Sequence, residues 1–185
     1  MDINNETLSL ASGIIWLGFS LASGWAKKRS WSISLQTFGF IFAGLQAYYA
    51  GVYGLVVLII FNIFRNIIFY QADKHMWARS KWWSINFIGV STIIYLIVTP
   101  MNVIWVYIPL FARVLGIMGY ANLDNYVAKK WHLSANLLWV TYYAGMNLWP
   151  SMIADVLKGI VMAVSLPRTK KYRDSLLERS QEASI

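Results

Sequence analysis

The chain has 185 residues, of which 58% are hydrophobic and 13% are charged, and its formal net charge is +8. Soluble domains are about 45–50% apolar and about 25% charged, so this composition excludes an ordinary globular domain. The chain has no cysteine, which excludes disulfides, thiolate metal sites and cysteine nucleophiles. We therefore expect an all-α integral membrane protein, because helices satisfy their own backbone hydrogen bonds in lipid.

Seven apolar segments follow one another along the chain, separated by very short connections. They are residues 8–25, 31–49, 52–70, 82–98, 103–121, 131–143 and 149–166. Several are shorter than the about 20 residues of a helix that crosses a membrane, so their ends are defined only to within a few residues. The first lacks a basic region before it, so it is expected to remain as a helix rather than to be cleaved as a signal peptide. We therefore predict seven transmembrane helices.

Basic residues fill every second connection between these segments and the stretch after the last one. They are Lys27, Lys28, Arg29, Lys74, Arg79, Lys81, Lys129, Lys130, Arg168, Lys170, Lys171, Arg173 and Arg179. Connections rich in lysine and arginine stay cytoplasmic, so the amino terminus is predicted outside and the carboxyl terminus inside. Anionic headgroups of the cytoplasmic leaflet then account for the net charge, and no nucleic-acid partner is expected. Residues 167–185 form a cytoplasmic tail, expected to be solvated or, alternatively, to form a short surface helix on anionic lipid.

The sequence contains an internal repeat. Tyr-Tyr-Ala-Gly occurs at residues 48–51 and 142–145, each time at a turn on the outer side. Each copy is followed by a polar residue and then by a cation three positions later. These pairs are Asn62 with Arg65 and Asp155 with Lys158. We therefore predict a single membrane domain in which two parallel three-helix repeats, residues 8–70 and 103–166, are joined by an inverting linker helix, residues 82–98.

This order of three, one and three helices resembles the architecture of the SWEET, PQ-loop and PnuC-type vitamin transporters. Residues 61–69, 106–120 and 138–158 resemble the YgjV-like bacterial inner-membrane proteins. The resemblance rests on the Asn-x-x-Arg of Asn62 and Arg65 and on Ala144, Gly145, Met152, Ile153 and Asp155. It implies a multi-pass protein of the bacterial cytoplasmic membrane and gives no substrate. The Pro-Gln pairs of PQ-loop proteins are absent, and Pro109 is predicted to bend the fifth helix.

Four ionisable side chains lie within the apolar segments: Arg65, Arg113, Asp155 and Lys158. A charge at the centre of a bilayer costs about 2.5–3.5 kcal/mol, and such residues usually face the interior of the bundle or water. At a rise of about 1.5 Å per residue, Arg113 and Lys158 fall near the midplane. Two alternatives remain open, namely that Asp155 pairs with Lys158 within the helix and that Arg65 reaches the cytoplasmic headgroups.

Aromatic side chains at mid-membrane depth form a second candidate group. They are Trp16, Tyr48, Tyr49, Tyr95, Trp139, Tyr142 and Tyr143. Aromatic walls with a few polar groups are typical of small-molecule pockets, and Gln36 and Asn62 are expected to donate hydrogen bonds there. Trp139 is the preferred pocket residue because a buried indole N–H needs a partner. Ordinary packing is the alternative for each of these aromatic residues.

These patterns predict a small transporter or facilitator that moves a small polar or aromatic-ring solute through a midplane cavity between the two three-helix bundles. The predicted substrate-binding residues are Arg113, Asp155, Lys158, Asn62, Arg65, Gln36 and Trp139. An enzyme is not expected, because His75 and His132 are predicted at the cytoplasmic interface and no H-E-x-x-H or paired carboxylates occur. No metal or cofactor is expected. A non-transporting membrane partner, such as a sensor, immunity or assembly subunit, is the alternative function, and homo-oligomerisation is left open.

Overall fold

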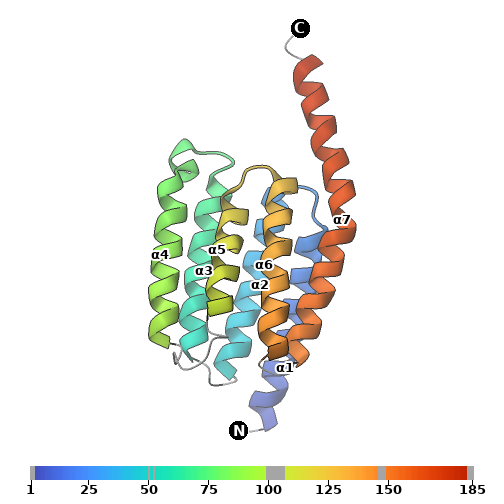
Figure 1. Ribbon diagram of the computed structural model, residues 1–185. Helices are drawn as coiled ribbons and strands as arrows, with labels where there is room; N and C mark the ends of the chain where they lie inside the picture. The colour runs from blue at the N-terminus through green and yellow to red at the C-terminus, as the bar shows by residue number, and fades with distance from the viewer. Residues whose placement is uncertain (1–2, 50, 52, 99–106, 146–148, 183–185) are drawn as a thin grey trace.

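The computed structural model describes residues 3–49, 51, 53–98, 107–145 and 149–182, which form a bundle of seven α-helices and one short 3-10 helix (Figure 1). Their bounds are α1 Ile3–Trp25, α2 Arg29–Tyr49, α3 Tyr53–Gln71, η1 Met76–Arg79, α4 Lys81–Val98, α5 Tyr107–Ala121, α6 Asn125–Gly145 and α7 Trp149–Glu182. No strand occurs in these ranges. The predicted all-α class and the order of seven helices are therefore confirmed.

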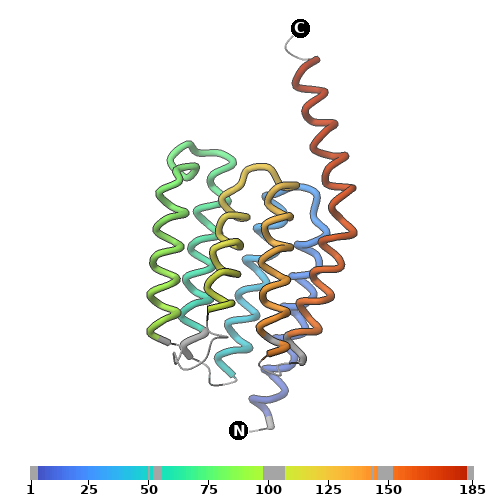
Figure 2. The backbone as a smooth tube through the Cα atoms, in the orientation of Figure 1, coloured from blue at the N-terminus to red at the C-terminus, as the bar shows by residue number. Residues whose placement is uncertain are grey.

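Consecutive helices pack side by side in alternating directions, and α7 also packs against α1 (Figure 1). The connections at residues 26–28, 72–80 and 122–124 lie together at one end of the bundle, and the amino terminus lies at the other. We call the end formed by these three connections the basic end. Figure 2 shows that α7 continues well beyond the other helices on this side. All the predicted cytoplasmic cations thus belong to one end of the molecule or to the projecting part of α7.

The two candidate repeats correspond to α1–α3 and α5–α7. They touch each other where α1 packs on α7 and where α3 meets α5. Small residues allow the first of these contacts: a β-carbon added to Gly24 of α1 would lie 3.1 Å from Cγ of Met162 in α7. Between α2, α3, α4 and α5 lies an apolar core of Ile33, Phe69, Phe87, Ile117 and Tyr120.

Helix length and hydropathy identify fewer membrane-spanning helices than the seven predicted. Among the described residues one helix, Asn4–Trp25, is long and apolar enough to cross a membrane. Val56–Gln71 and Tyr107–Ala121 are apolar but shorter. Seven transmembrane helices are therefore not shown by this criterion.

Helix α6 begins at Asn125, earlier than the predicted start at residue 131. Asp124 precedes the helix, and its carboxylate Oδ1 accepts a hydrogen bond of 2.8 Å from the backbone N–H of Tyr126. Aspartate is among the best residues for this capping position because it satisfies a first-turn N–H that has no partner within the helix. The prediction from hydropathy, residues 131–143, did not include this polar first turn.

Helix α7 runs without a break through Pro167, so residues 167–182 are helical and not disordered, and most of them are exposed. Contact of this helical tail with lipid, the alternative given above, stays a prediction. Proline removes one helical hydrogen bond, and a side chain of α6 joins the turns before and after it. The Nζ of Lys129 donates to the Oγ of Ser165 and to the Oγ1 of Thr169, both at 2.9 Å, on either side of the proline. Burial, together with the charge of Arg168, lowers the pKa of Lys129 from 10.5 to about 8.

The predicted bend at Pro109 stays a prediction. The described part of α5 begins at Tyr107, and the residues before it, which would share the bend, lie outside the described part of the chain.

Candidate functional site

Arg65 is buried inside the bundle, with only 6% of its surface exposed. The Cζ of its guanidinium lies 4.1 Å from the centre of the Tyr120 ring in α5. Its Nη2 donates to the Oδ1 of Asn66 at 3.0 Å. The alternative in which Arg65 reaches the headgroups is therefore contradicted, because the guanidinium is held between α3 and α5.

Asn66 extends this contact to α2. Its side chain is completely buried, and its Nδ2 donates to the Oγ1 of Thr37 at 3.2 Å. Thr37 in turn donates to the backbone carbonyl of Ile33 at 2.8 Å. Buried polar groups are stable only when they are hydrogen-bonded, so this chain fixes the orientation of the Asn66 amide and hence of the oxygen that faces Arg65.

Tyr120 connects Arg65 to α6, because its ring meets the imidazole of His132 edge to face at 4.4 Å. The imidazole lies directly against Gly119, where an added β-carbon would be 2.9 Å from its Cε1 and Nε2. The structure places His132 half-buried between Tyr120 and Gly119, and its predicted position at the cytoplasmic interface stays a prediction.

Arg113, in α5, makes a second contact between an arginine and a tyrosine ring. Its Cζ lies 4.9 Å from the centre of the Tyr95 ring in α4. The charge of Arg113 also acts on Arg65, so α3 and α5 bring two guanidinium groups into one electrostatic environment. No carboxylate of the described residues lies within 4 Å of Arg65.

Two ionisable residues lie in the apolar part of α7, Asp155 and Lys158. Asp155 is buried, and the Nδ2 of Asn136 in α6 donates to its backbone carbonyl. Gly159 makes room for this amide, since a β-carbon there would lie 2.9 Å from Nδ2. Lys158 is half-buried, and no ion pair within 4 Å joins it to Asp155 in the described part of the chain. The predicted pairing within α7 is therefore reduced to a longer-range attraction.

The structure does not bring the remaining predicted site residues into this group. Gln36 and Asn62 are half-buried, and neither side chain makes a hydrogen bond to another described residue. Trp139 packs edge to face against Tyr142, with ring centres 5.9 Å apart. These three positions stay predictions as solute contacts.

Arg29 is the functional candidate that the sequence did not single out. It is the first residue of α2 and is buried, and its guanidinium donates to the backbone carbonyls of Phe69, Tyr120 and Asn122. Its Nη1 also pairs with Asp73 at 2.7 Å. The ends of α3 and α5 carry partial negative charge, which a cation at this position neutralises. Burial lowers the pKa of Arg29, and Asp73 partly offsets this effect.

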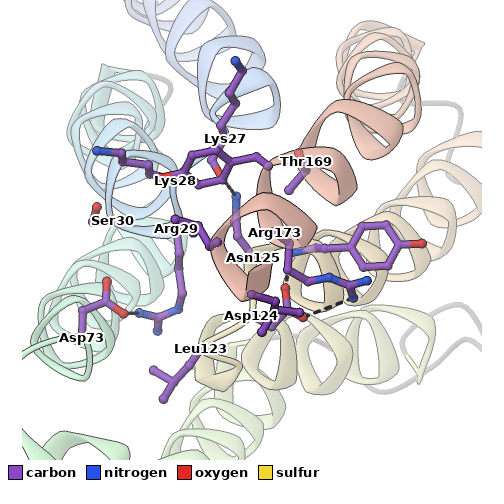
Figure 3. A pocket seen from close by; sticks show the side chains of 14 residues that line it. Lys27, Lys28, Arg29, Ser30, Asp73, Leu123, Asp124, Asn125, Thr169 and Arg173 are labelled. Atoms are coloured by element: carbon purple, nitrogen blue, oxygen red, sulfur yellow. Dashed lines mark hydrogen bonds and ion pairs between the residues drawn. The ribbon is translucent and has the colours of Figure 1, made fainter. Parts of the chain in front are cut away.

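Two hollows are lined in part by Arg29. A cavity of about 480 Å³ opens at the basic end, between the α1–α2 connection, the α5–α6 connection and α7 (Figure 3). A second hollow, of only about 10 Å³, is bordered by Arg29, Tyr120 and His132. The predicted midplane cavity stays a prediction.

No protein-family model, no curated protein and no solved structure matches this chain.

Proposed function

We propose that the protein is a seven-pass membrane protein that carries a small anionic or strongly polar solute through the interior of its helix bundle. The exposed surface supports the membrane location. Each of the seven helices presents large apolar side chains outward, for example Leu10, Phe38, Phe64, Ile85, Phe111, Leu137 and Ile160. Exposure of apolar surface to water costs about 25 cal/mol per Å², and this cost disappears when lipid covers the surface.

Aromatic residues at the basic end support the proposed orientation. Trp25, Trp31, Trp77 and Trp82 are all exposed and lie at helix ends on this side. Tryptophan prefers the headgroup level of a membrane, and lysine and arginine prefer the cytoplasmic side. The basic end is therefore the cytoplasmic end in this proposal.

The buried guanidinium of Arg65 is the observation that carries the solute proposal. Arg65, Arg113 and Lys158 are three cations on α3, α5 and α7, of which Arg65 is buried, and the acid Asp155 lies on α7 as well. An uncompensated charge in a low-dielectric interior costs several kcal/mol. An anionic or strongly polar solute lowers this cost, and so does water before the solute binds. The rings of Tyr120 and Tyr95 hold the guanidinium groups of Arg65 and Arg113 in place.

In this proposal Arg29 is the barrier toward the cytoplasm. Its side chain lines both the cavity at the basic end and the small hollow beside Tyr120 and His132. A solute that passes to the cytoplasm would have to displace the hydrogen bonds of Arg29 to the ends of α3 and α5.

The solute is tested by thermal stabilisation of the purified protein, because a bound ligand raises apparent stability by mass action. We expect at least one compound from a panel of anionic and neutral nucleosides, vitamins, sugars and amino acids to stabilise the wild type and not Arg65→Gln. Lys81→Gln is the matched control, since it removes one cation from an exposed position at the basic end. The proposal fails if no compound acts, or if both variants respond like the wild type.

The absence of native cysteine makes the membrane topology directly testable. A maleimide that cannot cross membranes should label Asn5→Cys in intact cells. Met76→Cys and Ser180→Cys should react only after permeabilisation. Labelling of all three in intact cells, or recovery of the protein in the soluble fraction, contradicts the seven-pass proposal.

The alternative function, a non-transporting partner subunit, is favoured by one observation. The part of α7 after Pro167 projects from the bundle and exposes Leu176 and Leu177 (Figure 1). A variant truncated after Arg168 distinguishes the two functions. If the protein is a transporter, the truncated variant should still be stabilised by the solute, and this stabilisation should still require Arg65.

A further inference from the structure

We propose that the cavity at the basic end is a binding site for a phosphate-bearing amphiphile, with the phosphate beside Lys27, Lys28 and the start of α2 and the apolar body along α7. The volume of about 480 Å³ falls in the range of roughly 300–1,000 Å³ that is typical of small-molecule sites. This inference does not depend on transport, because it uses only the residues that line the cavity.

The charges around the cavity do not balance. Four cations line it, Lys27, Lys28, Arg29 and Arg173, and two acids, Asp73 and Asp124, so four minus two leaves a net charge of +2. Both acids are already used: Asp73 pairs with Arg29 at 2.7 Å, and Asp124 lies 3.6 Å from Arg173. Neither Lys27 nor Lys28 has a carboxylate within 4 Å among the described residues. Figure 3 shows the side chain of Lys28 reaching toward Ser30 and that of Lys27 pointing away from it.

The two helices that start at this cavity differ in how their first turns are capped. At α6 the carboxylate of Asp124 accepts the N–H of Tyr126, so that end is already occupied by an anionic group. At α2 the residue before the helix is Lys28, whose side chain has no acceptor. No described side chain accepts from the backbone N–H groups of Arg29 or Ser30. The α2 side therefore adds open amide donors to the two lysines and is the side on which a phosphate is expected.

The opposite wall of the cavity is apolar. Leu123 follows α5, and Leu176 and Leu177 lie on the projecting part of α7, and all three are exposed. The last turns of α7 run beyond the other helices (Figure 1). An apolar chain placed along these leucines removes this surface from water while its phosphate stays beside the lysines.

The same chemistry is available from two sources. An anionic phospholipid of the cytoplasmic leaflet carries a phosphate and an acyl body, and so does a soluble alkyl phosphate ester. The experiment uses the full chain in neutral detergent, with octyl phosphate below its micelle-forming concentration as the soluble probe. Nanodiscs that contain phosphatidylglycerol, compared with phosphatidylcholine alone, provide the lipid arm.

We expect Lys27→Gln combined with Lys28→Gln to weaken binding by about tenfold in at least one arm. Lys170→Gln combined with Lys171→Gln removes the same charge from exposed positions of α7 outside the cavity and should leave binding nearly unchanged. Leu176→Gln combined with Leu177→Gln should weaken octyl phosphate more than inorganic phosphate. An effect confined to one arm supports the site and identifies the source.

Three results overturn the proposal. The first is the absence of binding in both arms. The second is equal weakening by the two lysine pairs, which assigns the effect to the general charge of the basic end. The third is equal affinity for inorganic phosphate and octyl phosphate, because it would exclude a contribution from the apolar wall.

Discussion

Gly119 offers the sharpest test of how closely α5 and α6 approach. A β-carbon at this position would lie 2.9 Å from two atoms of the His132 ring and 3.1 Å from the backbone carbonyl oxygen of Ala128. Alanine gains about 1 kcal/mol over glycine in a helix interior. Overpacking costs about 1–3 kcal/mol. We therefore expect Gly119→Ala to lower the free energy of unfolding by about 0–2 kcal/mol.

Gly116 is the matched control on the same helix, since a β-carbon there meets nothing within 4 Å. Gly116→Ala should raise the free energy of unfolding by about 1 kcal/mol through helix propensity alone. The two variants should thus differ by about 1–3 kcal/mol, and each kcal/mol shifts the midpoint of thermal unfolding by about 2–4 °C in a chain of this size. Thermal unfolding in neutral detergent, followed by tryptophan fluorescence, measures the difference.

The substitution Gly119→Ala in a His132→Ala protein distinguishes the contact with the His132 ring from the contact with the Ala128 backbone oxygen. In His132→Ala the nearest contact of the new β-carbon is removed and the Ala128 oxygen remains, so Gly119→Ala should cost less there than in the wild type. If Gly119→Ala raises the free energy of unfolding as much as Gly116→Ala does, the close approach of α5 and α6 at Gly119 is refuted. An equal cost in both backgrounds would show that the imidazole does not lie against Gly119.

Further predictions concern the basic end. Arg29→Met should destabilise the fold by about 3 kcal/mol or more, because Asp73 and the carbonyls of α3 and α5 lose their cation, whereas Lys28→Met should change stability little. Lys129→Met should increase hydrogen exchange of the α7 amides after Pro167, measured by mass spectrometry, with no comparable change in α4. The free energy of unfolding should rise between about pH 8 and 10.5 in the wild type and less in Lys129→Met, because the unfolded state then binds more protons at this lysine. Equal pH profiles for the two proteins would contradict the burial of its charge.

The helices themselves were largely predictable from the sequence. Apolar runs and charged connections predicted all seven, and the structure begins or ends most of them within a few residues of the predicted bounds. The exceptions are polar helical turns, namely the start of α6 at Asn125 and the part of α7 after Pro167. Hydropathy does not detect such turns because their side chains are polar. A signal was present in Asp124, whose side chain caps the first turn of α6.

The candidate site was predicted in part. Arg65 and Asp155 are buried, as expected for ionisable residues within apolar segments that face the bundle interior; for Arg65 the sequence also left contact with headgroups open. Gln36 and Asn62 were chosen as polar groups beside an aromatic pocket, but the structure gives them no hydrogen bond among the described residues. The sequence groups Arg29 with the loop cations because Lys27 and Lys28 directly precede it, and nothing in its local sequence distinguishes it from them.

The sequence by itself determined the helical class, the order of the seven helices and the gathering of cations at one end, because these features depend on the polarity of residues close together in the chain. Only the tertiary structure decided which polar groups meet. Arg29 and the carbonyl of Tyr120 are 91 residues apart, and Lys129 and Thr169 are 40 apart. Such contacts depend on the packing and rotation of whole helices, which local patterns of polarity do not specify. The same rotation brings His132 against Gly119 and opens a cavity, rather than a packed core, beside Lys27 and Lys28.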